Sequence, residues 1–270
     1  MATADAATDD ATNEALVLRR NRDGIASLTL NRPRAYNALS LDLMQALIDA
    51  LDAIAENRDI KAVILAGAGK GFCAGHDLKE LRGNTSRTFY EQTFELCSRL
   101  MLRLVTLPQP VIAQVHGIAT AAGCQLVATC DLAVAAEDAR FATPGVNIGL
   151  FCSTPMVALS RAVGRKQAME MLLLGEMVPA PRAVEVGLIN RSVPAADLQA
   201  EAEALAAKIV SKSPLVIKIG KQAFYRQIDR TSEDAYAYTA QVMTENMLAR
   251  DAEEGIDAFI EKRPPTWTGE

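Results

Sequence analysis

The chain lacks the features that mark nucleic-acid-binding, membrane-spanning and disulfide-stabilised proteins. Its 270 residues carry a formal net charge of −5, so it has no general electrostatic attraction to nucleic acid or anionic lipid. No apolar run approaches the roughly 20 residues that span a bilayer. The five cysteines form no CxxC pair, which indicates neither a disulfide framework nor a thiolate metal site. We therefore expect no nucleic-acid partner, no membrane insertion, no bound metal and a location in the reducing cytoplasm.

Nucleotide-binding signatures are also absent. Glycines cluster at 67–71, directly after an apolar run, but neither GxGxxG nor GxxxxGK[ST] occurs, and a flexible turn is the better interpretation. The first 14 residues contain neither the basic segment of a signal peptide nor the arginine-rich pattern of a transit peptide. We expect residues 1–14 to form a disordered acidic tail, because chain termini are usually poorly ordered.

Half of the residues are hydrophobic, and their spacing predicts an α/β core followed by helices. Asp-Gly at 23–24 lies between two apolar runs and predicts a hairpin. Ser40 is a predicted N-cap, and Thr88 with Glu91 fits a capping box. We expect strands at 16–19, 25–30, 62–66, 111–115, 132–136 and 188–193, and helices after Ser40, after Thr88 and over 156–163, 167–174, 182–187, 198–210, 214–226 and 232–248. The pattern predicts a core domain over 15–195 and a helical region over 196–270 that supports oligomerisation.

The stretch 116–131, HGIATAAGCQLVATCD, is predicted to begin as a loop rich in glycine and alanine and to continue as an apolar helix. Small residues let another molecule approach the backbone, and the N–H groups of the first helical turn have no partner within the helix. Such N–H groups attract anions and carbonyl oxygens that develop negative charge. We therefore interpret this helix start as half of an oxyanion hole.

Four segments together resemble the signature of the crotonase superfamily, the enoyl-CoA hydratases and isomerases. They are NRPRAYNALS at 31–40, FCAGHDLKE at 72–80, GIATAAGCQL at 117–126 and FATPG at 141–145. The resemblance extends over about residues 15–267. It implies a ClpP-like spiral of repeated ββα units that assembles as a homotrimer or a dimer of trimers. It also implies an acyl-CoA substrate, so that coenzyme A enters as part of the substrate and the protein holds no prosthetic group.

The resemblance also assigns roles to residues. The thioester carbonyl would accept hydrogen bonds from the backbone N–H groups of His76 and Ala122. Coenzyme A would lie along two loops and reach the C-terminal element, often of a neighbouring subunit. The residues that this implies for coenzyme A binding are Arg32, Arg34, Ala35, Tyr36, Lys70, Phe72, Ala74, Gly75, Phe259 and Lys262.

Both carboxylates that hydration requires are missing. Hydratases of the superfamily carry one glutamate after the Gly-Cys pair and another after the proline of F-x-x-P, where this chain has Gln125 and Gly145. An amide can orient water but has no useful proton to exchange, and glycine has no side chain. No aspartate or glutamate occurs between Arg140 and Ala168, so that segment supplies no shifted acid.

Several groups are candidate substitutes. The His76 ring could exchange protons, since histidine titrates near neutral pH and a methylmalonyl-CoA decarboxylase of the superfamily also carries Gly-His-Asp. Alternatively, the ring only packs or forms a local hydrogen bond while its backbone N–H acts. Asp77 and Glu80 are catalytic or serve a helix start, and Asp131 is catalytic or bonds a turn. Three functions stay open: an enzyme of the enoyl-CoA hydratase type, a decarboxylase of malonyl-type thioesters that uses His76, and a noncatalytic acyl-CoA-binding protein.

Overall fold

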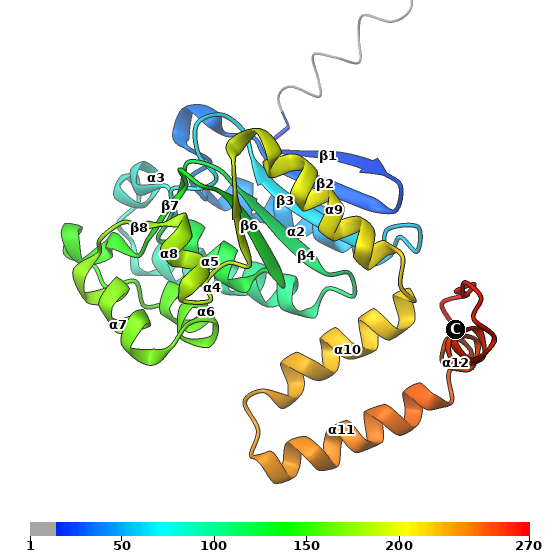
Figure 1. Cartoon of the computed structure of the whole chain (residues 1–270). Coiled ribbons are helices and arrows are strands. Elements are labelled where there is room, and N and C mark those ends of the chain that lie inside the picture. The colour runs from blue at the N-terminus through cyan, green and yellow to red at the C-terminus, as the bar shows by residue number, and fades with distance from the viewer. Residues whose placement is uncertain (1–14) are drawn as a thin grey trace, which may run out of the picture.

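The structure is a computed structural model that describes residues 15–270, so the tail predicted for residues 1–14 lies outside the described part. A six-stranded sheet runs through the core in the order β1-β2-β3-β4-β6-β9 (Figure 1). Its strands are β1 (Val17–Arg22), β2 (Ile25–Leu30), β3 (Ala62–Gly67), β4 (Val111–Val115), β6 (Leu132–Ala136) and β9 (Arg191–Val193). Strands β1 and β2 form the predicted hairpin, and both Asp23 and Gly24 have positive φ, as a type I′ turn requires. The remaining pairs are parallel.

A second, three-stranded sheet was not predicted. It consists of β5 (Ile118–Thr120), β7 (Arg140–Ala142) and β8 (Val178–Pro179). Strands β4 and β6 each lead into one of these short strands, and β5 is followed by a helix, which gives the ββα repeat that the resemblance implies. An isolated parallel bridge between Cys73 and Ala119 joins the glycine-rich loop after β3 to β5. This second layer therefore brings two loops together beside one helix start.

The helices predicted from apolar spacing begin within two residues of their expected starts, and one of the two predicted N-caps is confirmed. The helices of the structure are α2 (Leu41–Ala55), α3 (Leu78–Gly83), α4 (Arg87–Thr106), α5 (Ala122–Thr129), α6 (Pro155–Ala162), α7 (Arg165–Leu174), α8 (Ala180–Glu185), α9 (Leu198–Val210), α10 (Pro214–Gln227), α11 (Ser232–Met247) and α12 (Arg250–Glu261), with single 3₁₀ turns at Pro33–Ala35, Pro144–Ile148 and Ala195–Asp197. Ser40 caps α2 by accepting from the N–H of Leu43. The capping box at Thr88 is wrong: Ser86 caps α4, and Glu91 pairs with Arg87 instead.

Two apolar layers cover the sheet. Helices α2, α4 and α5 contribute to the large core with side chains such as Leu47, Leu100 and Leu126. Helix α9 packs on the other side, where Ala202 and Ala206 contact the layer formed by β3 and β4. Burial on both sides explains why β3 is a continuous apolar run and why β4 is apolar except for Gln114.

The C-terminal helices α10 and α11 extend away from the sheet, and α12 lies near the end of α9 (Figure 1). Their exposed apolar side chains include Tyr236, Met243, Met247, Leu248, Phe259 and Ile260. Within residues 15–270, no helix is both long and apolar enough to cross a membrane.

Candidate active site

The peptide between Gly75 and His76 is held from one side. Its carbonyl oxygen, on Gly75, accepts from the N–H of Leu39 at 2.7 Å, and the N–H of Asp77 donates to the carbonyl oxygen of Leu39 at 3.1 Å. Because a trans peptide directs its N–H opposite to its C=O, the N–H of His76 points away from Leu39. Within the described residues, this N–H donates to no protein acceptor.

The start of α5 presents a second free donor. Ala121 adopts φ 50° and ψ −117°, and its N–H donates to the carbonyl oxygen of Ala142 at 2.9 Å. Its carbonyl oxygen accepts the first helical hydrogen bond from Gln125 at 3.0 Å, which fixes the peptide whose N–H belongs to Ala122. In residues 15–270, no acceptor is bonded to the N–H of Ala122. This unbonded N–H belongs to the residue that the resemblance implies as an oxyanion donor.

The two donors lie on touching segments of backbone. A Cβ added at Gly75, where φ is +94°, would lie 2.8 Å from the Cβ of Ala121 and 3.2 Å from the nitrogen of Ala122. A Cβ at Gly123 would lie 2.0 Å from the carbonyl oxygen of Cys73. Only glycine fits this close contact between α5 and the 67–77 loop. Two free N–H groups on adjoining backbone segments can bind one carbonyl oxygen that gains negative charge.

Gln125 and Gly145, the positions where the resemblance implies glutamates in hydratases, differ in their surroundings. Gln125 is buried, and its Oε1 lies 3.9 Å from the Sγ of Cys97, whose thiol pKa burial raises to about 12. A Cβ at Gly145 would lie 2.9 Å from the carbonyl oxygen of Leu150 and 3.0 Å from the Sγ of Cys152. The first position therefore holds a neutral amide beside a neutral thiol, and neighbouring atoms crowd the second.

The His76 ring packs edge-on against Phe94, with 5.4 Å between ring centroids and 83° between planes. Its Nε2 is buried without a hydrogen-bond partner among the described residues. Burial lowers the pKa of the ring to about 4. The imidazole is therefore neutral at physiological pH, where its unpartnered Nε2 can accept or donate according to the tautomer.

The neighbouring acidic residues serve structural roles. Asp77 caps α3 by accepting from the N–H groups of Lys79 and Glu80, and it pairs with Arg32 at 2.8 Å. Desolvation acts to raise the Asp77 pKa, but these hydrogen bonds outweigh it, so the pKa is lowered. Glu80 accepts from the N–H of Leu41 at 3.1 Å. Both carboxylates are thus engaged in holding helix starts.

Asp131 differs from the turn contact that the sequence predicts. It accepts from the N–H of Val111 at 2.7 Å, from the ammonium of Lys221 at 2.6 Å and from the hydroxyl of Tyr225 at 3.0 Å. It therefore fastens α10 to the core. His116 is also structural, since its Nε2 lies 2.8 Å from the carbonyl oxygen of Gly69.

The residues predicted for coenzyme A divide into three groups. The exposed residues are Arg34, Tyr36 and Lys70, and the half-buried ones are Ala35 and Ala74. The third group comprises Arg32, whose side chain bonds to the protein backbone, and the buried residues Phe72 and Gly75. The Phe72 side chain is fully buried in the core. Phe259 and Lys262 belong to α12 and its C-cap, and Figure 1 shows α12 well away from α3 and α5. One chain therefore does not bring these two residues to the helix start.

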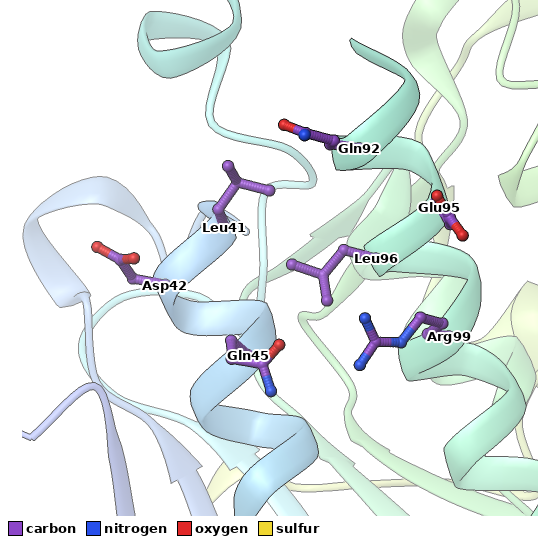
Figure 2. A pocket seen from close by; sticks show the side chains of 7 residues that line it. All are labelled: Leu41, Asp42, Gln45, Gln92, Glu95, Leu96 and Arg99. Carbon is purple, nitrogen blue, oxygen red and sulfur yellow. The ribbon is translucent and has the colours of Figure 1, made fainter. Parts of the chain in front are cut away.

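Two cavities lie beside α4. A surface pocket of about 380 Å³ lies between α2 and α4. Figure 2 shows the side chains that line it, which are Leu41, Asp42, Gln45, Gln92, Glu95, Leu96 and Arg99. A cavity of about 490 Å³ lies among α4, α5, α6 and α10, and Gln125, Phe224 and Tyr225 are part of its lining. In the part of the chain that the structure describes, no group of three His, Cys, Asp or Glu side chains is placed to hold a metal ion.

Curated relatives match most of the chain. The rat and human proteins named enoyl-CoA hydratase domain-containing protein 3, mitochondrial, are each 47% identical, over 94% and 93% of this chain and 84% and 83% of their own lengths. Their names contradict the cytoplasmic location expected from cysteine content and the N-terminal sequence, and that prediction is wrong. Cysteine content and the composition of the first residues are not specific to the cytoplasm.

Solved structures match the fold. A crystal structure of an enoyl-CoA hydratase from Mycobacterium smegmatis is 55% identical with a TM-score of 0.92, over 94% of this chain and 99% of that one. The human enoyl-CoA hydratase domain-containing protein 3 is 46% identical with a TM-score of 0.91, over 93% and 100%. The predicted crotonase fold is confirmed. Residues 20–270 match the family described as enoyl-CoA hydratase/isomerase. The chain therefore belongs to the enoyl-CoA hydratase/isomerase family.

Proposed function

We propose that this protein binds an acyl-CoA thioester and stabilises its enolate with the backbone N–H groups of His76 and Ala122. The observation that carries this proposal is the pair of free N–H groups on touching segments, each with its peptide plane fixed through the carbonyl side. Donors held in place before the reaction lower the energy of developing charge without reorganisation, and one such donor contributes about 10²–10³ in rate.

The same site is poorly equipped for hydration. Adding water to an enoyl thioester needs a base to activate water and an acid to protonate the α-carbon. Gln125 and Gly145 supply neither, and Asp77 and Glu80 are engaged at helix starts. A function that forms an enolate without a carboxylate base therefore fits these residues better.

Decarboxylation of a malonyl-type thioester is the second candidate. The bond between the α-carbon and the carboxylate breaks, its electron pair forms the enolate, carbon dioxide leaves, and the α-carbon then takes a proton that derives from water. Two observations favour it: the His76 ring is neutral with an unpartnered Nε2, and Gln125 adds no negative charge to repel a substrate carboxylate. Neutral surroundings also raise the energy of that carboxylate relative to the products.

Coenzyme A would contact the exposed loop residues Arg34, Tyr36 and Lys70, while Phe259 and Lys262 would act from a neighbouring subunit of a homotrimer or dimer of trimers. The exposed apolar side chains of α11 and α12 support such an assembly, because large exposed apolar patches mark interfaces.

Purified protein would be tested for turnover of crotonyl-CoA and methylmalonyl-CoA, and calorimetry would compare binding of butyryl-CoA with that of free coenzyme A. We expect butyryl-CoA to bind more tightly than free coenzyme A, and methylmalonyl-CoA to be turned over faster than crotonyl-CoA. Preferential binding without turnover of either thioester would assign the noncatalytic function. Equal affinity for butyryl-CoA and free coenzyme A would refute the oxyanion-hole proposal.

A further inference from the structure

We propose that Arg32 is a positioning residue of the oxyanion hole, fixing the His76 N–H through Leu39 and Asp77. The inference rests on the proposed function. It differs from the role implied for Arg32 by family resemblance, which is direct contact with coenzyme A.

Among residues 15–270, Leu39 is the residue that hydrogen-bonds to both peptides flanking the His76 Cα. Leu39 donates to the carbonyl oxygen of Gly75 and accepts from the N–H of Asp77, so it holds the peptides on both sides of the His76 Cα. The direction of the His76 N–H therefore depends on where the backbone at Leu39 lies relative to the backbone at 75–77. Any group that ties these two segments together sets the geometry of the hole.

Arg32 is that tie. Its Nη1 donates to the carbonyl oxygen of Ala38 at 2.5 Å, one residue before Leu39, and its Nη2 donates to the Oδ2 of Asp77 at 2.8 Å, one residue after His76. The exposed fractions of the Arg32 and Asp77 side chains are 24% and 14%, so water screens the pair only in part. A planar guanidinium suits this arrangement because it directs several N–H groups in fixed directions.

The backbone of Arg32 is itself anchored. Its N–H donates to the Oδ1 of Asn37 at 2.9 Å, and its carbonyl oxygen accepts from the N–H of Asn37 at 3.0 Å. The Asn37 Nδ2 donates in turn to the carbonyl oxygens of Gly71 and Phe72 in the glycine-rich loop. The guanidinium therefore extends from a turn that is fixed to the same loop that carries Gly75.

The two roles of Arg32 predict different kinetics. A coenzyme A ligand lost in Arg32→Ala would weaken the binding of free coenzyme A. A lost positioning residue would instead loosen one donor, which lowers kcat and carbonyl polarisation while free coenzyme A binds as before. Because complete loss of a donor costs about 10²–10³ in rate, we expect misplacement of one to cost about 10-fold or more.

The experiment uses full-length Arg32→Ala, Arg32→Lys and Asp77→Asn. Its probe is 4-(dimethylamino)cinnamoyl-CoA, whose absorption moves to longer wavelength as its thioester carbonyl is polarised. Arg82→Ala is the matched control, since Arg82 is an exposed arginine in the last turn of α3, the helix that Asp77 caps. Calorimetry with free coenzyme A and thermal unfolding are measured on every variant.

We expect Arg32→Ala and Asp77→Asn to lose much of the absorption shift, Arg32→Lys to retain part of it, and the control to match the wild type. The affinity for free coenzyme A should change less than twofold. If a folded Arg32→Ala protein shows the full absorption shift at saturating probe, the positioning role is overturned, while the proposed function stands. A full shift together with weaker binding of free coenzyme A would assign Arg32 to coenzyme A contact instead. If the wild type itself shows no shift, the proposed function fails and the positioning role falls with it. Asp77→Asn decides the matter if Arg32→Ala does not fold.

Discussion

Replacing Gln125 by glutamate tests whether the site is a hydratase scaffold that lacks its carboxylates. The exposed fraction of Gln125 is 4%, and glutamate has nearly the same shape. The polar side-chain atom bonded to its Oε1 is the Sγ of Cys97 at 3.9 Å, which is a neutral thiol because burial raises its pKa to about 12. The new carboxyl group would therefore lose water without gaining a cation, and its pKa should rise by about 3 units or more.

The magnitude for stability follows from this pKa. Each unit corresponds to about 1.36 kcal/mol, so a rise of about 3 units destabilises the folded variant by about 4 kcal/mol once the carboxyl is ionised. The folded pKa lies above the unfolded value of about 4.3, so the folded state binds more protons between the two. The penalty is therefore absent below about pH 4 and grows until about pH 7. Urea unfolding of Gln125→Glu and wild type at pH 5 and pH 8 measures it.

The same carboxyl should change the activity. A group with a pKa near 7 exchanges protons efficiently at neutral pH, and general acid–base catalysis contributes about 10²–10⁴ in rate. With Gly145 unchanged, only one of the two carboxyl functions returns, so we expect crotonyl-CoA hydration to rise by about 10-fold. Loss of the ultraviolet absorbance of the conjugated thioester measures the rate, and Gln125→Leu is the control without a proton to exchange.

Two results would refute this reasoning. Equal destabilisation at pH 5 and pH 8 would show that the carboxyl at 125 is not desolvated. A folded but inactive Gln125→Glu would show that one carboxyl is insufficient and that position 145 limits the reaction. Gly145→Glu alone is no remedy, because its Cβ would lie 2.9 Å from the Leu150 carbonyl oxygen and 3.0 Å from Cys152.

Three further predictions concern groups outside that substitution. NMR titration should show that His76 stays neutral down to about pH 4. In the unfolded chain the same histidine takes up a proton below its ordinary pKa of 6.5, so the free energy of unfolding should fall by about 3 kcal/mol between pH 6.5 and pH 4. The variant His76→Phe should lack this pH dependence. Lys221→Met should destabilise the fold by about 3–5 kcal/mol in urea unfolding by leaving Asp131 without its cation, whereas Tyr225→Phe should cost about 1 kcal/mol; equal effects would contradict the ion-pair reasoning. Light scattering at micromolar concentration should give a trimer or hexamer that Leu248→Glu weakens, and a monomeric wild type would contradict the assembly.

Most of the fold was predictable because apolar spacing and capping residues are local signals. The parallel strand β3 is a continuous apolar run, β4 is apolar except for Gln114, and α2 begins directly after Ser40, whose hydroxyl caps it. Strands β5, β7 and β8 are only two or three residues long, so they have no periodicity to read and exist through pairing with one another. Helix α12 was not among the predicted helices, and it has no side-chain N-cap that could have indicated its start. Its first turn is held by Asp251, which accepts from the N–H groups of Thr268 and Gly269.

The site was predictable only as far as the backbone. The small residues at 121–123 indicate the helix start, and family resemblance adds the partner N–H at His76. The direction of Arg32 was not predictable, because its partner Asp77 is 45 residues away in sequence. The role of Asp131 depends likewise on Lys221, 90 residues further on. The sequence shows that Gly145 lacks a carboxylate, but only the packing of Leu150 and Cys152 shows that the space is filled.

The helix start at Ala122 separates what the fold supplies from what side chains supply. In the proposed site both donors are backbone groups whose directions are set by hydrogen bonds from the N–H groups of Leu39 and Gln125. The proposed thioester polarisation therefore does not depend on which side chain stands at 76, 122 or 125. Proton transfer has no such protection, because it requires a titratable side chain at a defined place. Under the proposed function, the absence of both carboxylates therefore removes hydration and leaves enolate stabilisation intact. A reaction whose enolate arises by breaking a carbon–carbon bond needs only what this backbone still provides.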